Sequence, residues 1–227
     1  MHGARAHRAG RERDSGRACH ARAPEPGAQL RVKNYDEPYF RRWYGARWSV
    51  PPAELKRRAR LALAAAEYLL ERPVRSVLDV GCGEGRWRAP LVRIRPGLAY
   101  VGVDPSEFVV RRHGRRRGIR LGSLGGLGEL GLRRRFDLVV CSDVIHYVQA
   151  ADLRRGLEAM HVLAGGLVYV DAFTSEDAFE GDRDGWQPRS ARAYRRAFRD
   201  AGFVACGLNC WVGSEQADRL SALERCG

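Results

Sequence analysis

A short apolar stretch that runs into a glycine-rich turn, residues 77–86, constrains the fold of this chain most strongly. Val77, Leu78 and Val80 have the length and β-branched content of a buried strand, and glycine then occupies every second position from residue 81 to residue 85. Glycine lets the backbone turn with positive φ and lets a ligand approach the chain closely. The unpaired amides of a following helix favour an anionic or carboxylate-bearing group. The stretch therefore predicts a strand, a ligand-binding turn and a helix.

The glycine spacing separates this turn from the dinucleotide-binding fingerprint, which needs a third glycine three residues after the second; position 86 is Arg. Asp79 instead stands two residues before the first glycine, and Gly85 stands two residues after Gly83. The pattern resembles the first motif of the class I S-adenosylmethionine-dependent methyltransferases, in which the acid and the glycines surround the methionine end of the cofactor. A strand-turn-helix without a ligand is the alternative. The resemblance implies cofactor contacts by Asp79, Gly81, Cys82 and Gly83.

A second set of candidate cofactor contacts follows the next two predicted strands, residues 98–104 and 119–122. Asp104 ends the first of them, and an acid at this position of a nucleotide-binding fold can accept hydrogen bonds from both ribose hydroxyls. It resembles the ribose-binding acid of the family; capping of the next helix is a compatible alternative. Ser123 stands where the family usually has an aspartate for the adenine amino group. Ser123 and Leu124 are therefore the predicted adenine contacts.

The strand at residues 136–141 and the loop at 142–148 resemble the part of the family fold where acceptor and methyl donor meet. The resemblance places Ser142 beside the cofactor. Methyl transfer is an in-line displacement, so the enzyme positions the nucleophile and supplies a base where that nucleophile carries a proton. An imidazole can accept a proton at neutral pH, although a capping or packing role is the alternative for a histidine here. The candidate catalytic residues are His146, Asp143 and Tyr147.

Acceptor-specific signatures of nucleic-acid enzymes in this superfamily are absent from the sequence. No Asn/Asp-Pro-Pro-Tyr follows the strand at 136–141, and no Pro-Cys pair supplies a nucleophile for a pyrimidine carbon. These absences favour a small-molecule acceptor with an oxygen or nitrogen nucleophile. An RNA methyltransferase is the second hypothesis, and a domain that binds the cofactor or RNA without catalysis is the third. The sequence predicts neither the acceptor nor the oligomeric state.

The charge of the chain is strongly basic, with 40 Lys and Arg against 27 Asp and Glu, a net charge of +13. Nucleic acid is therefore a partner to consider. Residues 1–33 hold eight basic and three acidic residues and almost no large apolar residue before Leu30, so we expect this extension to be disordered. We interpret it as a dispensable extension; a transit peptide and an RNA-binding tail are the alternatives.

The remaining composition indicates a cytoplasmic protein. The chain has no apolar core of a signal peptide and no run of about 18 apolar residues that could span a bilayer. Six cysteines are scattered without a Cys-x-x-Cys pair, which indicates neither a disulfide framework nor a zinc site. We therefore expect a reducing compartment, no membrane partner and no metal.

An aromatic segment at residues 34–52 precedes the main domain, which is predicted at residues 53–227. Tyr35, Tyr39 and Trp43 are spaced by four and would line one face of a helix. Packing on the core is one interpretation of these aromatics. The functional interpretation is a lid that covers the cofactor and shapes the acceptor pocket.

Helical and strand patterns alternate over the rest of the chain. Helices are predicted at 53–71, 84–94, 107–117, 151–163 and 190–201, and further strands at 167–172 and 203–212, with a turn at Gly165-Gly166. An acidic insertion at 174–188 would lie over the ligand crevice, as a solvated loop or as a contact for a cationic acceptor. The alternation predicts an α/β Rossmann-like fold of the class I methyltransferase type, with a mostly parallel sheet covered by helices on both faces. The pattern does not decide whether the sheet has a seventh strand.

Overall fold

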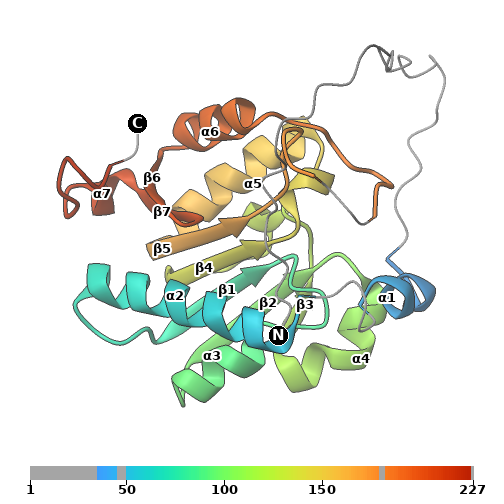
Figure 1. Ribbon diagram of the computed structural model, residues 1–227. Helices are drawn as coiled ribbons and strands as arrows, with labels where there is room; N and C mark the ends of the chain where they lie inside the picture. The colour runs from blue at the N-terminus through green and yellow to red at the C-terminus, as the bar shows by residue number, and fades with distance from the viewer. Residues whose placement is uncertain (1–34, 45–49, 179–181, 226–227) are drawn as a thin grey trace, which may run out of the picture. The chain divides into compact units, whose positions relative to one another are not determined.

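The computed structural model describes residues 35–44, 50–178 and 182–225 (Figure 1). The predicted disordered extension 1–33 lies outside these residues, as does part of the aromatic segment, including Trp48. The helices are α1 (Glu37–Trp43), α2 (Pro52–Leu70), α3 (Arg88–Ile94), α4 (Glu107–Arg117), α5 (Ala150–Leu163), α6 (Ala191–Asp200) and α7 (Ser214–Ala217). The strands are β1 (Ser76–Val80), β2 (Ala99–Asp104), β3 (Ile119–Leu121), β4 (Phe136–Ser142), β5 (Ala164–Asp171), β6 (Phe203–Gly207) and β7 (Cys210–Gly213).

These strands form one sheet in the order β3-β2-β1-β4-β5-β7-β6. Strands β1 to β5 pair in parallel, and β7 pairs antiparallel with both β5 and β6. The strand order changes direction between β1 and β4, and α/β proteins bind ligands at the carboxyl ends of the strands beside such a switch. The predicted mostly parallel α/β sheet is confirmed.

Apolar cores fill both faces of the sheet. Helices α2 and α3 cover one face, where Leu63 and Leu91 pack against Val77 and Leu138. Helices α5 and α6 cover the other face, where Leu157 packs with Leu78 and other strand residues (Figure 1). Successive residues of β1 thus enter opposite cores, which explains why its sequence is continuously apolar around a single acid.

Three local predictions were wrong. Helix α3 begins at Arg88 rather than at 84, because positive-φ glycines extend the turn through Gly85. Gly165 and Gly166 lie inside β5, where a Cβ on Gly166 would be 2.4 Å from the Asp137 carbonyl oxygen. The region at 203–212 is a hairpin of β6 and β7, because Leu208 and Asn209 both adopt positive φ, which reverses the chain in two residues. Its second strand is the seventh of the sheet.

Helix α1 packs next to α4. Asp36 caps α1 by accepting a hydrogen bond from the Tyr39 amide, and the Phe40 ring lies 5.9 Å from the Phe108 ring between centroids. The Ser106 hydroxyl donates to the Tyr35 carbonyl at 2.5 Å. The described part of the aromatic segment therefore contacts the region that follows β2.

Candidate functional site

The glycine turn after β1 has the backbone geometry that its sequence predicts. Gly81, Gly83 and Gly85 all have positive φ, between +52° and +72°. The Gly81 and Cys82 amides both donate to the Val103 carbonyl, which ties the turn to the end of β2. A Cβ at residue 81 would lie 2.3 Å from Val144, so glycine is required there by space as well as by backbone conformation.

Asp79 lies at the centre of the sheet and is only 1% exposed. Burial raises the pKa of its carboxyl to about 7, while a hydrogen bond from the Tyr100 hydroxyl, 2.6 Å long, acts in the opposite direction. The nearby Asp104 raises the pKa further. An acid held in this way favours a cationic partner, because a positive charge would restore the ionised form.

Asp104 ends β2 directly beside the glycine turn. Its carboxylate accepts the Gly83 amide at 2.7 Å through Oδ2 and the Ser106 amide at 2.9 Å through Oδ1. Burial raises the pKa of Asp104, and the two amide hydrogen bonds oppose that shift. A carboxylate has about four lone-pair sites, so two remain for further donors such as a pair of hydroxyl groups.

The other predicted cofactor contacts occupy the same edge of the sheet. Ser123 accepts a hydrogen bond from the Gly126 amide, which shapes the turn after β3, and Leu124 is buried in the core beneath it. Ser142 ends β4 and donates to Asp171 Oδ2 at 3.2 Å. The same carboxylate oxygen is paired with Arg58 of α2. Ser123, Leu124 and Ser142 therefore lie at the carboxyl ends of β3 and β4, the edge at which β1 and β2 also end.

Asp143 and His146 form a close pair in the loop after β4. Nε2 of His146 lies 3.3 Å from Oδ1 of Asp143; the histidine side chain is 0% exposed and the aspartate side chain 61% exposed. The Phe173 amide donates to Nδ1 at 3.5 Å, which leaves the proton of a neutral ring on Nε2, facing Asp143. The carboxylate is therefore the accessible member of the pair, and the imidazole supports it from within the protein.

Tyr147 links this loop to the acidic insertion. Its hydroxyl donates to the Asp182 carbonyl at 2.9 Å, and burial raises its pKa, so the hydroxyl keeps its proton. Within the insertion, Glu176 accepts from the Ala191 amide at the start of α6, and Asp177 accepts from both the amide and the hydroxyl of Thr174. These two acids stabilise the insertion and the helix after it.

Sequence reasoning missed Arg58 at this edge, whereas Tyr44 belongs to the aromatic segment 34–52, which the sequence predicts to pack on the core or to form a lid. The Tyr44 hydroxyl is 2.3 Å from the position that a Cβ on Gly83 would take, so the ring covers the glycine turn. Burial raises the pKa of Tyr44, and the charges of Asp104 and Asp143 add to the shift. Arg58 lies on a helix far from β5 in sequence. Helical periodicity cannot signal either contact, because both depend on how distant segments pack.

Comparison with known proteins finds a matching domain model, relatives and solved structures. Residues 78–165 match the model of a methyltransferase domain, a span that begins inside β1 and ends inside β5. Over this span the chain is similar to the S-adenosylmethionine-dependent methyltransferases. The chain is 29% identical over 155 residues to the ubiquinone biosynthesis O-methyltransferase of Rhizobium johnstonii, an alignment that covers 58% of this chain and 59% of that protein. It therefore spans less than two thirds of the length of that relative.

Two solved structures share the fold of this chain. A sugar N-methyltransferase from Streptoalloteichus matches with a TM-score of 0.57 and 20% identity, over 86% of this chain and 94% of that one. A SAM-dependent methyltransferase from Archaeoglobus fulgidus matches with a TM-score of 0.56 and 17% identity, over 73% of each chain. Within the described residues, no helix is long and apolar enough to cross a membrane, and no cluster of three or more His, Cys, Asp or Glu is arranged to hold a metal.

Proposed function

We propose that this methyltransferase transfers the methyl group of S-adenosylmethionine to a hydroxyl or amine of a small molecule. The carrying observation is the proximity, at one edge of the sheet, of a glycine turn tied to Asp104 and a loop that presents Asp143. The similarity to a ubiquinone O-methyltransferase and to a sugar N-methyltransferase supports an oxygen or nitrogen nucleophile on a small acceptor.

The described residues fit the predicted cofactor. Asp104 keeps two lone-pair sites after its two amide hydrogen bonds, which matches the two ribose hydroxyls. Asp79 is a buried acid whose pKa a cationic ammonium group would lower. Gly81 and Gly83 leave room that a side chain would fill. Ser123, Leu124 and Ser142 complete the proposed contacts, and Cys82 lies buried in the turn.

Asp143 is the proposed general base. When bound, S-adenosylmethionine supplies an electrophilic methyl group on a sulfonium. The Asp143 carboxylate would accept the proton that the acceptor oxygen or nitrogen loses when it takes up the methyl group. His146 is a positioning residue in this proposal, since its ring is fully buried and its Nε2 lies 3.3 Å from Oδ1 of Asp143. Tyr147 fixes the same loop against the insertion.

Tyr44 and helix α1 are the proposed lid of the site. Three observations support this assignment: the position of Tyr44 over Gly83, the packing of Phe40 on Phe108, and the hydrogen bond between Ser106 and Tyr35. A lid that excludes water strengthens the electrostatic contacts beneath it. In this proposal the ring of Tyr44 shifts when the cofactor enters and then covers it.

Calorimetric titration of the full chain with S-adenosylhomocysteine tests the proposal. We expect saturable binding with a micromolar dissociation constant, and weaker binding for Asp104→Ala. Transfer of a labelled methyl group to a panel of phenolic, amine and RNA acceptors then separates a small-molecule enzyme from an RNA enzyme. Absence of binding to a folded chain would refute the cofactor assignment. Binding without transfer to any acceptor would favour the non-catalytic alternative.

A further inference from the structure

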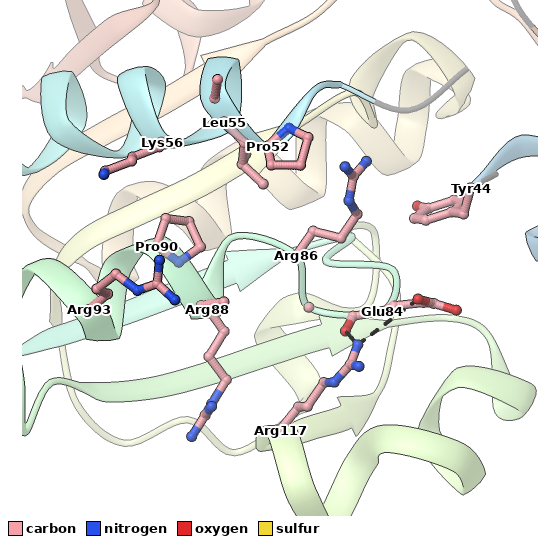
Figure 2. Close-up of a pocket in the computed structure, with 13 residues that line it drawn as sticks. Tyr44, Pro52, Leu55, Lys56, Glu84, Arg86, Arg88, Pro90, Arg93 and Arg117 are labelled. Atoms are coloured by element: carbon pink, nitrogen blue, oxygen red, sulfur yellow. Dashed lines mark hydrogen bonds and ion pairs between the residues drawn. The ribbon is translucent and has the colours of Figure 1, made fainter. Parts of the chain in front are cut away.

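A cavity of about 650 Å³ lies beside the glycine turn, and the proposed lid residue Tyr44 is among the residues that line it (Figure 2). Its walls come from Tyr44 after α1, from the start of α2, from the glycine turn and α3, and from the end of α4. None of the predicted cofactor residues lines it. Five of its lining residues are cationic and one is acidic: Lys56, Arg86, Arg88, Arg93, Arg117 and Glu84.

The single acid, Glu84, can balance only one of these five cations, and its partner Arg117 is among them. Oε1 of Glu84 lies 3.7 Å from His113 Nε2, and Oε2 lies 4.0 Å from the Arg117 guanidinium. In the part of the chain that the structure describes, neither Lys56 nor Arg88 nor Arg93 has a carboxylate within 4.0 Å. Positive charge therefore exceeds negative charge around the cavity.

Two of the cations are held in place by backbone groups. The Arg86 guanidinium donates to the Val50 carbonyl at 2.6 Å, and the Arg117 guanidinium donates to the Glu84 carbonyl. Figure 2 shows these two side chains on opposite sides of the turn, with Tyr44 beside it. A guanidinium that is already fixed loses less conformational entropy when it binds an anion.

Three arginines elsewhere on the surface are arranged differently. Arg41, Arg111 and Arg154 each pair with a glutamate four residues away on the same helix. Such pairs cancel charge locally, whereas like charges gathered around a cavity repel one another until an anion binds. The pKa of His113, which borders this region, is lowered by burial and by the charges of Arg117 and Arg112, although Glu84 opposes that shift.

We propose that this cavity binds the phosphate or diphosphate group of a small molecule. Guanidinium groups form paired charge-assisted hydrogen bonds with phosphate oxygens, and the volume is in the range of small-molecule sites. Pro52, Leu55 and Pro90 provide an apolar wall for the remainder of such a molecule. S-adenosylmethionine carries no phosphate, so the ligand is distinct from the cofactor. A compact cavity favours a small ligand over a nucleic acid, which needs a groove along its backbone.

The test is calorimetric titration of the full chain with inorganic pyrophosphate and with uridine diphosphate at constant ionic strength. We expect saturable binding that weakens at least about tenfold in the double variant Arg88→Gln/Arg93→Gln. The control is Arg192→Gln/Arg195→Gln, which removes the same charge from α6, away from the cavity; its affinity is expected to stay within about twofold of the parent. Lys56→Gln and Arg60→Gln form a second matched pair on α2.

The two probes distinguish the sources of the phosphate. Tighter binding of uridine diphosphate assigns the cavity to a phosphorylated organic molecule, and equal or tighter binding of pyrophosphate assigns it to a free inorganic anion; both support the site. If the cavity variant and the control variant lose the same affinity for these anions, the loss comes from net charge alone and the proposal is overturned. Binding of single-stranded RNA in the absence of pyrophosphate binding would also overturn it. Because the readout is direct binding, failure here leaves the methyl-transfer proposal untouched.

Discussion

The Gly83 backbone amide donates a 2.7 Å hydrogen bond to the Asp104 carboxylate. This contact joins the turn after β1 to the end of β2, two segments that are 21 residues apart. Because Asp104 also accepts the Ser106 amide, one side chain holds both the glycine turn and the start of α4. The proposed ribose acid is therefore also a structural residue, and experiments on it must separate the two roles.

Replacement of Asp104 by alanine is expected to weaken S-adenosylhomocysteine binding by roughly 2–4 kcal/mol through lost charge-assisted hydrogen bonds. The same variant should lose about 1–3 kcal/mol of unfolding free energy, because two buried amides lose their acceptor. Asp104→Asn keeps one acceptor oxygen, so its affinity and its unfolding free energy should lie between those of the parent and those of the alanine variant. Calorimetry and urea unfolding measure the two effects, and unchanged affinity in a folded alanine variant would contradict the ribose assignment.

The raised pKa of Asp79 predicts that the stability of the folded chain depends on pH. Its pKa is about 7 in the folded chain against 3.8 ordinarily, so the native state binds the proton more tightly than the unfolded state. Stability from this group is complete below about pH 4 and is lost as the pH rises through about 7. Asp79→Asn should therefore gain stability relative to the parent between about pH 5 and pH 8, by up to roughly 4 kcal/mol. Parallel urea-unfolding curves with a constant difference over this range would disprove it.

Asp143 and His146 are expected to differ in their kinetic effects. Asp143→Asn removes the accessible carboxylate and should lower kcat by about 10²- to 10⁴-fold with little change in S-adenosylhomocysteine affinity. His146→Gln should lower kcat less and shift the pH profile of the remaining activity, because the carboxylate stays but loses its support. Steady-state kinetics over a pH series measure both. A larger loss in His146→Gln than in Asp143→Asn would make the imidazole the base.

Gly81 and Gly97 form a matched pair for the close packing of the turn. Both have positive φ, but a Cβ at residue 81 meets Val144 at 2.3 Å whereas one at residue 97 meets nothing within 4 Å. Gly97→Ala should cost only about 1–2 kcal/mol of stability for the strained backbone. Gly81→Ala should cost about 1–3 kcal/mol more, part of which Val144→Ala restores in a double-mutant cycle. Equal losses of stability in Gly81→Ala and Gly97→Ala would contradict this prediction and show that the Val144 side chain can move away at no cost in free energy.

Local sequence signals predicted most elements of the sheet. Alternation of helix and strand patterns gave β1, β2 and β4, and the boundaries of α2 and α5 within one residue. The hairpin of β6 and β7 was not predicted, because Leu208 and Asn209 are not one of the usual hairpin-turn pairs, Asn-Gly or Asp-Gly. The glycines of β5 were interpreted as a turn because their actual role, close approach to β4, depends on a strand distant in sequence.

The sequence by itself predicted the fold class and a resemblance to one family, because strand and helix periods and the motif from Asp79 to Gly85 are local properties of the chain. Only the tertiary structure decided which groups meet: Tyr44 with Gly83, Arg58 with Asp171, and Asp143 with a fully buried His146. It also gathered the cations of the cavity from three separate segments. Such contacts depend on the packing of distant elements, and burial, which sets the pKa of Asp79, follows only from that packing.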